Sequence, residues 1–445
     1  MAGKSGMPTS YREYMPEQSL LLPPSLRDWL PEGHLVHFIS DVVDQLDLKA
    51  FYERYEGDGR RKQPFEPRMM VKVLLYAYAS GTFSSRKIAK RIEEDVALRM
   101  LAGGNFPSHR TISDFRKLNL EAFRGVFVQV VRFAQEAGLV RMGTIATDGT
   151  KVKANASKHK AMSYGRMVQE EKRLEKEIEQ LVKQAEKQDA EEDAEFGEDV
   201  RGDELPEDLR HRETRLKKIK EAKKRLEQRQ VEADQKKGRA ADDGQRNRQT
   251  RRRYKRPFGV PPDRAQENFT DTDSRIMKAG NGFEQCYNGQ IVVDDTAQII
   301  VANRLTQSAA DTDQLLPNVV EAFASTGECP IVLLADAGYR SEPNFLELEA
   351  CGVNGYISLG REGKLAAVSN PKALATNRIK ARLATRAGKD HYRKRKSIVE
   401  PVFGWIKQAL GFRQFLMRGV EPVRGEWNLV CLAVNFKRLH VAFAS

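Results

Sequence analysis

The feature that most constrains the fold of this chain is the continuous apolar run Ile331-Val332-Leu333-Leu334-Ala335, which ends on Asp336. Such a run is typical of a strand buried on both faces in the centre of a sheet. A second β-prone run, Thr144-Ile145-Ala146-Thr147, ends on Asp148-Gly149. Because α/β sheets place their sites at the carboxyl ends of strands, we expect both aspartates to meet at one sheet edge.

The segments around these two runs alternate strand and helix patterns. A hairpin is expected from residues 285–293 and 298–305. The other expected elements are a helix at 311–325, a helix at 341–350, a strand at 356–359, a basic helix from about residue 396 that carries Glu400, and a last helix at 421–444. This order predicts an α+β or mixed α/β fold, a mixed five-stranded sheet with flanking helices.

The N-terminal part of the chain has a helical pattern throughout. Pro67 opens one helix, at the position where proline is tolerated, and Ser108 can cap another. The sequence therefore predicts a helical N-terminal domain at residues 1–140, ahead of a second domain at residues 141–445.

A highly charged segment, residues 163–235, interrupts the second domain. Leu174, Ile178, Leu181 and Ala185 form one thin apolar stripe, and Leu216, Ile219 and Leu226 form another. We expect an antiparallel helical hairpin insertion; the alternative is a solvated, partly disordered charge run. Residues 236–264, which include Arg251-Arg252-Arg253-Tyr254-Lys255-Arg256, read as a basic linker that can lie along phosphates.

Composition limits the partners of the chain. Its 445 residues carry a net charge of +13 and a pI near 9.4, which favours a polyanion such as nucleic acid. No stretch approaches the ~20 apolar residues of a membrane helix, so we expect a cytoplasmic protein with no membrane partner. The four cysteines form no C-x-x-C pair, which indicates neither a zinc site nor a disulfide framework.

Asp148, Asp336 and Glu400 are the candidate catalytic residues. Taken singly, an Asp before Gly is a common turn residue, and a Glu on a basic helix usually forms a surface ion pair. Three carboxylates brought together repel one another unless a cation compensates, and hard cations such as Mg²⁺ prefer oxygen ligands. The chain has no G-x-x-x-x-G-K-[ST] loop and no G-x-S-x-G elbow, which leaves nucleotide hydrolysis and acyl transfer without support.

Several segments together resemble a known family. They are Thr147-Asp148-Gly149-Thr150-Lys151, Ala335-Asp336-Ala337-Gly338-Tyr339, Val399-Glu400-Pro401-Val402-Phe403-Gly404, Asp273-Ser274-Arg275-Ile276-Met277, Tyr287-Asn288-Gly289-Gln290, Val434-Asn435-Phe436-Lys437-Arg438-Leu439 and His109-Arg110-Thr111-Ile112-Ser113-Asp114-Phe115-Arg116. This ordered set resembles the DDE-type transposases of bacterial insertion sequences.

The resemblance implies an RNase H-like catalytic domain and a metal site formed by Asp148, Asp336 and Glu400. Two Mg²⁺ ions, or Mn²⁺ in their place, would serve strand cleavage and strand transfer. It also implies a Tyr, Arg, Glu and Lys signature at fixed intervals. Lys407 keeps the last interval and Lys396 stands at the arginine position, whereas Arg393 occupies the tyrosine position and Tyr392 is one place out of step.

These residues suggest where DNA is held. Lys407 lies on about the same helical face as Glu400 and could meet a phosphate, although a solvated lysine is the alternative. The basic run Arg393-Lys394-Arg395-Lys396 is expected before the helix, along the DNA backbone, and the resemblance adds a DNA contact by Tyr392. Sequence choice is expected from the N-terminal helices through Arg110, Thr111, Arg116 and Lys117, in a helix-turn-helix-like pair. The alternative is a helical bundle that serves dimerisation.

The function implied is a transposase that acts on double-stranded DNA, both the terminal inverted repeats of its element and the target, in the nucleoid of a bacterium. Joining two ends implies a homodimer. Two alternatives share the fold: a domesticated, non-catalytic DNA-binding regulator, and a metal-dependent nuclease without strand transfer. An RNA-binding protein is disfavoured because the chain lacks the aromatic-rich glycine motifs of an RRM.

Overall fold

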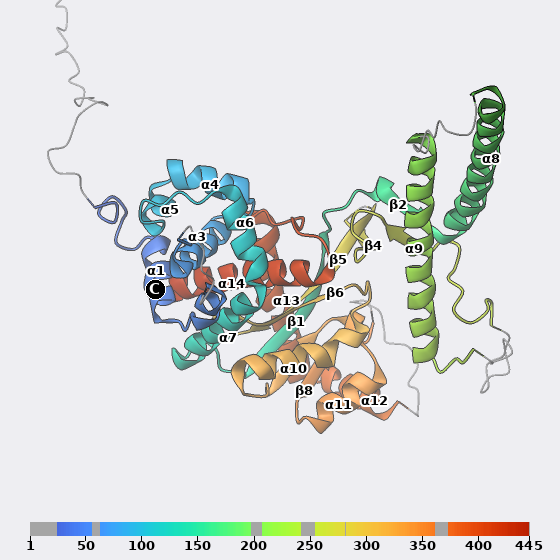
Figure 1. The fold of residues 1–445 in the computed structure, drawn as a ribbon. Coiled ribbons are helices and arrows are strands. Elements are labelled where there is room, and N and C mark those ends of the chain that lie inside the picture. The colour runs from blue at the N-terminus through green and yellow to red at the C-terminus, as the bar shows by residue number, and fades with distance from the viewer. Residues whose placement is uncertain are drawn as a thin grey trace, which may run out of the picture.

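The computed structural model describes residues 25–55, 63–196, 207–241, 254–280, 282–360 and 373–444, with the backbone alone for 184–196 and 207–209. Figure 1 shows a body of sheet and helices from which a long pair of helices projects. The first residues of the expected helical domain, the centre of the acidic stretch between the two hairpin helices, and Arg251, Arg252 and Arg253 of the expected basic linker lie outside the described residues.

The body is built on one mixed sheet. Its strands are β1 (Thr144–Lys153), β4 (Arg275–Ala279), β5 (Gly282–Asp294), β6 (Ile300–Thr306), β7 (Val332–Ala335) and β8 (Asn354–Ile357). They lie in the order β4-β5-β1-β7-β8. β6 also pairs with β5, along the part of β5 that follows its pairing with β4. β1 is antiparallel to β5 and parallel to β7, which is parallel to β8. The mixed sheet is confirmed, with β4 as a sixth strand that the sequence did not predict.

The expected end of the first strand at Asp148 is wrong. β1 continues to Lys153 because β5 pairs with it from Ile145 through Lys153. The parallel pairing with β7 stops earlier, at Ala146 opposite Leu334. Asp148 thus lies just beyond the residues of β1 that pair with β7, while its own backbone is still paired with β5.

Helices cover both faces of the sheet. After β6 come η3 (Thr312–Gln314), α10 (Leu315–Thr326), η4 (Ala337–Tyr339), α11 (Glu342–Ala350), α12 (Leu374–Ala384), α13 (Arg386–Gly404), η5 (Trp405–Ala409) and α14 (Val420–Ala444). Asn318 of α10 bonds to the Thr147 side chain, whereas Arg395 of α13 pairs with Asp148. Consecutive strand residues point to opposite faces, so α10 and α13 lie on opposite faces of the sheet.

The N-terminal region is helical, as expected. It comprises α1 (Leu35–Gln45), α2 (Lys49–Tyr52), η1 (Glu53–Tyr55), α3 (Pro67–Ala79), α4 (Ser85–Glu94), α5 (Val96–Leu101), α6 (His109–Leu118) and α7 (Leu120–Glu136). Pro67 begins α3, and the Ser108 hydroxyl caps α6 by accepting a bond from the Thr111 amide at 3.2 Å. The C-terminal helix α14 packs on α3 and α7, and one continuous apolar core joins these helices to the sheet.

The inserted helical hairpin is confirmed. It comprises η2 (Lys158–Lys160), β2 (Ala161–Ser163), α8 (Tyr164–Phe196), α9 (Glu207–Lys236) and β3 (Gln266–Asn268), with β2 and β3 paired at its base. Ion pairs of Lys223 with Glu171 and of Arg212 with Glu177 show that the helices are antiparallel. A small core of Met167, Leu174, Ile219, Ala222 and Leu226 joins them.

The helix that carries Glu400 begins earlier than expected. α13 starts at Arg386, where the Thr385 hydroxyl accepts a bond from the Gly388 amide at 2.9 Å. The basic run around Arg395 is therefore inside the helix, not before it, because Arg and Lys are good helix formers and Thr385 supplies the cap. No helix in the described ranges is long and apolar enough to span a membrane.

Candidate active site between β1 and β7

The register of the parallel strands brings Asp148 and Asp336 together. Ala146 of β1 stands opposite Leu334 of β7, and each aspartate follows two residues later on its own strand. Burial, and next to it the negative charge of Asp336, raise the pKa of the Asp148 carboxyl to about 6. The two carboxylates therefore act on each other at one edge of the sheet, as the sequence predicted.

Backbone amides fix the orientation of each aspartate. The Gly149 amide donates to Asp148 Oδ1 at 2.8 Å, and the Gly338 amide donates to Asp336 Oδ1 at 2.8 Å, which makes Asp336 the cap of η4. Gly149 is required for packing, because a Cβ there would lie 2.7 Å from Asp311 Oδ1 and closer still to the side-chain nitrogen Nε2 of Gln290. The Asp-Gly pair thus serves strand packing and not a turn.

Arg395 connects Glu400 to this pair of aspartates. Its Nη1 lies 3.2 Å from Asp148 Oδ2, and its Nη2 lies 4.0 Å from Glu400 Oε1. The Arg395 side chain is only 9% exposed, whereas that of Glu400 is 57% exposed. Burial alone would lower the pKa of Arg395, but the charge of Asp148, with contributions from Tyr392 and Asp336, raises it. A buried cation therefore lies between Asp148 and Glu400.

The position of this guanidinium bears on whether a metal ion fits. No three acidic, histidine or cysteine side chains within the described residues gather tightly enough to hold an ion by themselves. Arg395 nevertheless supplies positive charge where Asp148 and Glu400 face each other, and all the donors are carboxylate oxygens, the type that hard divalent cations prefer. Asp148, Asp336 and Glu400 are the residues that would hold such an ion, and in this structure Arg395 provides the compensating positive charge.

A fourth carboxylate, Asp311, belongs to the site and was missed from the sequence. It accepts hydrogen bonds from Asn288 Nδ2 at 2.6 Å, from Gln290 Nε2 at 2.7 Å and from Lys151 Nζ at 3.3 Å. Its charge also contributes to the raised pKa of Asp148. The Tyr287-Asn288-Gly289-Gln290 block was the available signal, because two amide side chains two residues apart share one face of a strand.

A buried polar network supports this arrangement from beneath. The Tyr339 hydroxyl donates to Gln290 Oε1, and Asn318 Nδ2 donates to Thr147 Oγ1 at 2.9 Å and to Gln290 Oε1 at 3.1 Å. Burial raises the pKa of Tyr339 well above its usual range, so its hydroxyl keeps its proton. The network fixes Gln290, which in turn holds Asp311.

The basic residues expected near Glu400 take different positions. Lys407 lies in the π-helical turn η5, and its Nζ donates to the Lys151 carbonyl at 3.4 Å. Burial lowers the pKa of Lys407. Arg393 is exposed and lies 3.7 Å from Asp390, Lys396 is exposed, and Tyr392 is half-buried beside Arg395. Of this set, Arg395 is the residue brought into the carboxylate cluster.

The N-terminal residues expected to contact DNA divide in two. On α6, Arg110 and Lys117 are exposed and Thr111 is half-buried. Arg116 is buried, and its Nη1 donates to the Tyr78 hydroxyl at 2.9 Å and to the Phe83 carbonyl at 2.7 Å. Arg116 thus ties α6 to α3 and its side chain is closed to DNA in this structure. The helix α5 lies in sequence between α4 and α6, which pack on each other.

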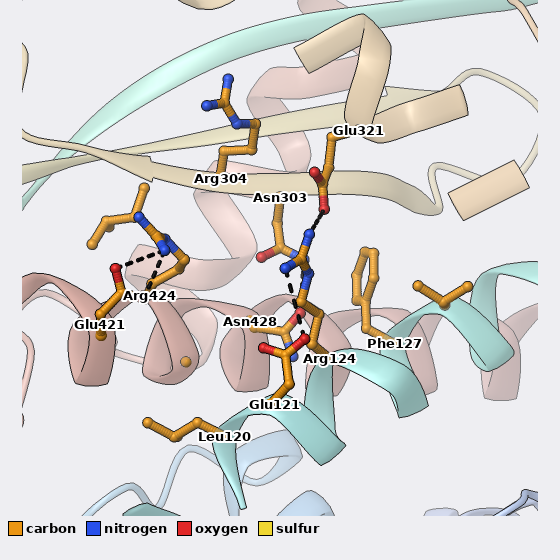
Figure 2. Close-up of a pocket in the computed structure, with 13 residues that line it drawn as sticks. Leu120, Glu121, Arg124, Phe127, Asn303, Arg304, Glu321, Glu421, Arg424 and Asn428 are labelled. Atoms are coloured by element: carbon orange, nitrogen blue, oxygen red, sulfur yellow. Dashed lines mark hydrogen bonds and ion pairs between the residues drawn. The ribbon is translucent and has the colours of Figure 1, made fainter. Parts of the chain in front are cut away.

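A cavity of about 400 Å³ lies between α7, β6 and α14 (Figure 2). Arg124 pairs there with Glu321 at 3.0 Å and with Glu121 at 3.8 Å, and Arg424 pairs with Glu421 at 2.7 Å. Three arginines and three glutamates line it, so its charges balance. It offers no attraction to a polyanion, and the Arg124–Glu321 ion pair joins α7 to α10, a helix that covers the sheet.

The sheet has the antiparallel β5 on one side of β1 and the parallel β7 and β8 on the other. Asp148 lies within β1, and Asp336 directly follows β7. This arrangement is that of an RNase H-like catalytic domain. Residues 24–118 match the family described as Transposase domain (DUF772), and residues 260–436 match the Transposase DDE domain. No curated protein and no solved structure matches the chain. The chain belongs to the DDE-type transposases of insertion elements.

The family match and the sheet together define the extent of the catalytic domain. Asp336 and Glu400 lie inside the DDE match, whereas Asp148 lies in neither range, because the hairpin insertion separates β1 from the rest of the domain. Pairing with β5 and β7 returns β1 to the centre of that domain. Membership implies a transposase enzyme with DNA as its partner, in a family that typically uses divalent metal ions.

Proposed function

We propose that this protein binds the terminal inverted repeats of its element and catalyses metal-dependent cleavage and joining of double-stranded DNA, with Asp148, Asp336 and Glu400 as the catalytic carboxylates. The observation that carries the proposal is the in-register placement of Asp148 and Asp336, with Arg395 as a buried cation between Asp148 and Glu400. Such a carboxylate set in a basic protein suits phosphodiester chemistry.

Each residue has a defined task in this proposal. Asp148 and Asp336 would hold one Mg²⁺ or Mn²⁺ ion between them, and Glu400 a second. When bound, two such ions ready the attacking oxygen and steady the leaving oxygen. Asp311 acts as a positioning residue through Gln290 and the Gly149 backbone. Arg395, freed from Asp148, would pair with a DNA phosphate on the helix that also carries Arg393 and Lys396.

The chemistry needs no further reactant. In cleavage, the oxygen of water forms a bond to phosphorus, the bond to the 3′ oxygen breaks, and that oxygen leaves as a 3′-hydroxyl. In joining, this 3′-hydroxyl oxygen bonds to a phosphorus of the target, and the target's own 3′ oxygen leaves. The second step conserves the number of phosphodiester bonds, so it requires no nucleotide triphosphate.

DNA contacts outside the carboxylates belong to the same proposal. Lys407 and Tyr392 flank the site, and Arg110, Thr111 and Lys117 offer the exposed side of α6 to a groove. The burial of Arg116 argues against a DNA contact by that residue. We further propose that two chains pair when two element ends are joined.

The test is cleavage and joining of labelled DNA that carries the ends of the element, with Mg²⁺. Wild type would be compared with Asp148→Asn, Asp336→Asn and Glu400→Gln, and with the control Asp390→Asn, which removes an exposed, ion-paired carboxylate from the same helix as Glu400. Joined products lost in the three variants but kept in the control support the proposal. Binding of the ends without cleavage by wild type would indicate a regulator, and cleavage without joining a nuclease.

A further inference from the structure

A second concave surface lies at the base of the helical hairpin, where η2 and β2 meet α8 and α9. This hairpin-base groove has a volume of about 400 Å³, and five basic side chains line it, with Phe269 among its apolar residues. The basic residues are His159, Lys160, Arg166, Arg215 and Lys218. No acidic residue is among the lining residues, in contrast to the balanced cavity of Figure 2.

The charge of the groove is compensated only in part. Across the described ranges, Arg215 has an ion pair with Glu170 at 3.7 Å, and Arg166 also interacts electrostatically with Glu170, whereas the side chains of Lys160 and Lys218 have no ion pair. An exposed pair at that distance contributes little. Like charges gathered in a concavity focus a positive potential and attract a polyanion.

The groove is held on a rigid frame, so its charges are positioned before any ligand arrives. Ile219 belongs to the hairpin core, and Met162 and Phe269 pack against that core. Beneath it, the buried Glu267 is paired with Arg225 at 2.7 Å and with Arg229. The Phe269 amide also donates to the Lys160 carbonyl at 3.0 Å. Ordering costs that would weaken a flexible basic tail are therefore small here.

The groove is also close in sequence to Asp148. η2 and β2 follow directly from β1, the strand that contains Asp148, and Figure 1 shows β2 between the sheet and the hairpin.

We propose that the hairpin-base groove binds the phosphate backbone of the duplex DNA on which the carboxylate site acts, so that the insertion is a DNA clamp. This inference rests on the proposed function and extends it to a segment with no assigned role. Lys and Arg contacts to phosphates supply affinity without reading sequence. The clamp therefore holds element ends and unrelated duplexes equally.

The test compares two double variants that each remove two lysines without ion pairs. Lys160→Ala/Lys218→Ala removes groove charges, and Lys217→Ala/Lys224→Ala removes exposed lysines of α9 that do not line the groove. Each lost phosphate contact should weaken duplex binding roughly fivefold at about 0.15 M salt and reduce the slope of log K against log salt by about 0.9. We expect roughly 25-fold weaker binding and a slope smaller by about 2 for the groove variant, with little change for the control.

Lysine acetylation of the wild-type protein provides a second measurement that does not depend on variant folding. Duplex DNA should protect Lys160 and Lys218 while Lys217 and Lys224 continue to react. Equal binding by both double variants, or equal protection by inorganic phosphate or polyglutamate, would overturn the inference. Its failure is distinguishable from that of the proposed function: a wild type that cleaves while the groove variant binds normally removes only the clamp, whereas protection without cleavage removes only the transposase.

Discussion

Replacement of Gly149 by alanine tests how the site is assembled. A Cβ at this position would lie 2.7 Å from Asp311 Oδ1 and 2.9 Å from Asn288 Oδ1, and closer still to the Gln290 amide nitrogen. Three side chains converge on one point and bond to one another, so none can move without breaking a bond to its neighbour. The strain cannot be relieved at one flexible side chain.

The cost follows from these contacts. Overpacking of a filled interior costs roughly 1–3 kcal/mol, and a lost hydrogen bond to a charged group about 1.5–3 kcal/mol. We therefore expect Gly149→Ala to lower the free energy of unfolding by about 3–5 kcal/mol. Displacement of Asp311 and Gln290 should also reduce DNA cleavage by the protein that remains folded.

Gly143→Ala is the matched control just before β1. Nothing lies within 4 Å of a Cβ at Gly143. The added methyl group should leave the free energy of unfolding unchanged or raise it by about 0.4–1 kcal/mol, because it restricts the unfolded chain. Urea unfolding followed by circular dichroism measures both variants. A Gly149→Ala protein as stable as Gly143→Ala would refute the packing argument.

Three further outcomes are expected. Asp148 has a pKa of about 6 in the folded chain, above its unfolded value, so its contribution to stability is present below about pH 4 and lost as the pH rises through 6. In urea unfolding, the advantage of wild type over Asp148→Asn should fall by roughly 2.5 kcal/mol from pH 4 to 7, and a flat difference would contradict the burial argument. Asp311→Asn should reduce cleavage at least about tenfold with DNA binding kept, while Asp313→Asn, an exposed neighbour, should not; equal activities would remove Asp311 from the site. Arg116→Ala should cost about 2–4 kcal/mol of stability, because it leaves the buried Tyr78 hydroxyl without its donor. Lys117→Ala should instead leave the melting temperature unchanged and weaken DNA binding. The reverse pattern would overturn both assignments.

Local signals in the sequence were sufficient to place two of the three carboxylates. The apolar runs before Asp148 and Asp336 depend on a few consecutive residues, and their pairing follows from sheet topology. The second half of β1 was missed because Asp148, Lys151 and Lys153 make it polar, and its strand conformation is imposed by the long partner β5. Strand propensity is subject to such tertiary context.

Contacts between residues distant in sequence determine the two features of the site that the sequence did not predict, namely the presence of Asp311 and the position of Arg395 beside Asp148. Asp311 lies in the connection before α10, and nothing in its neighbours indicates that Lys151 and Gln290 meet it there. Arg395 is one of several consecutive basic residues, and the helical phase of α13 alone decides that it faces Asp148 while Arg393 faces solvent. That phase depends on the cap at Thr385, which the sequence reading did not use.

The insertion between β1 and its partner strands also delays their pairing during synthesis of the chain. The ribosome must add about 190 residues between Ile145 and its parallel partner Leu333, which takes about 10–40 s at typical rates of synthesis. Both edges of β1 are unpaired until β5 has been made, and the edge that pairs with β7 stays open until Leu333 is added. Exposed strands of this kind associate with other chains. The charges of Asp148, Lys151 and Lys153 make such association unfavourable. The charge of Asp148, a proposed catalytic carboxylate, thus also disfavours aggregation of the nascent protein. The proposed site is complete only after Glu400 has been added, late in synthesis.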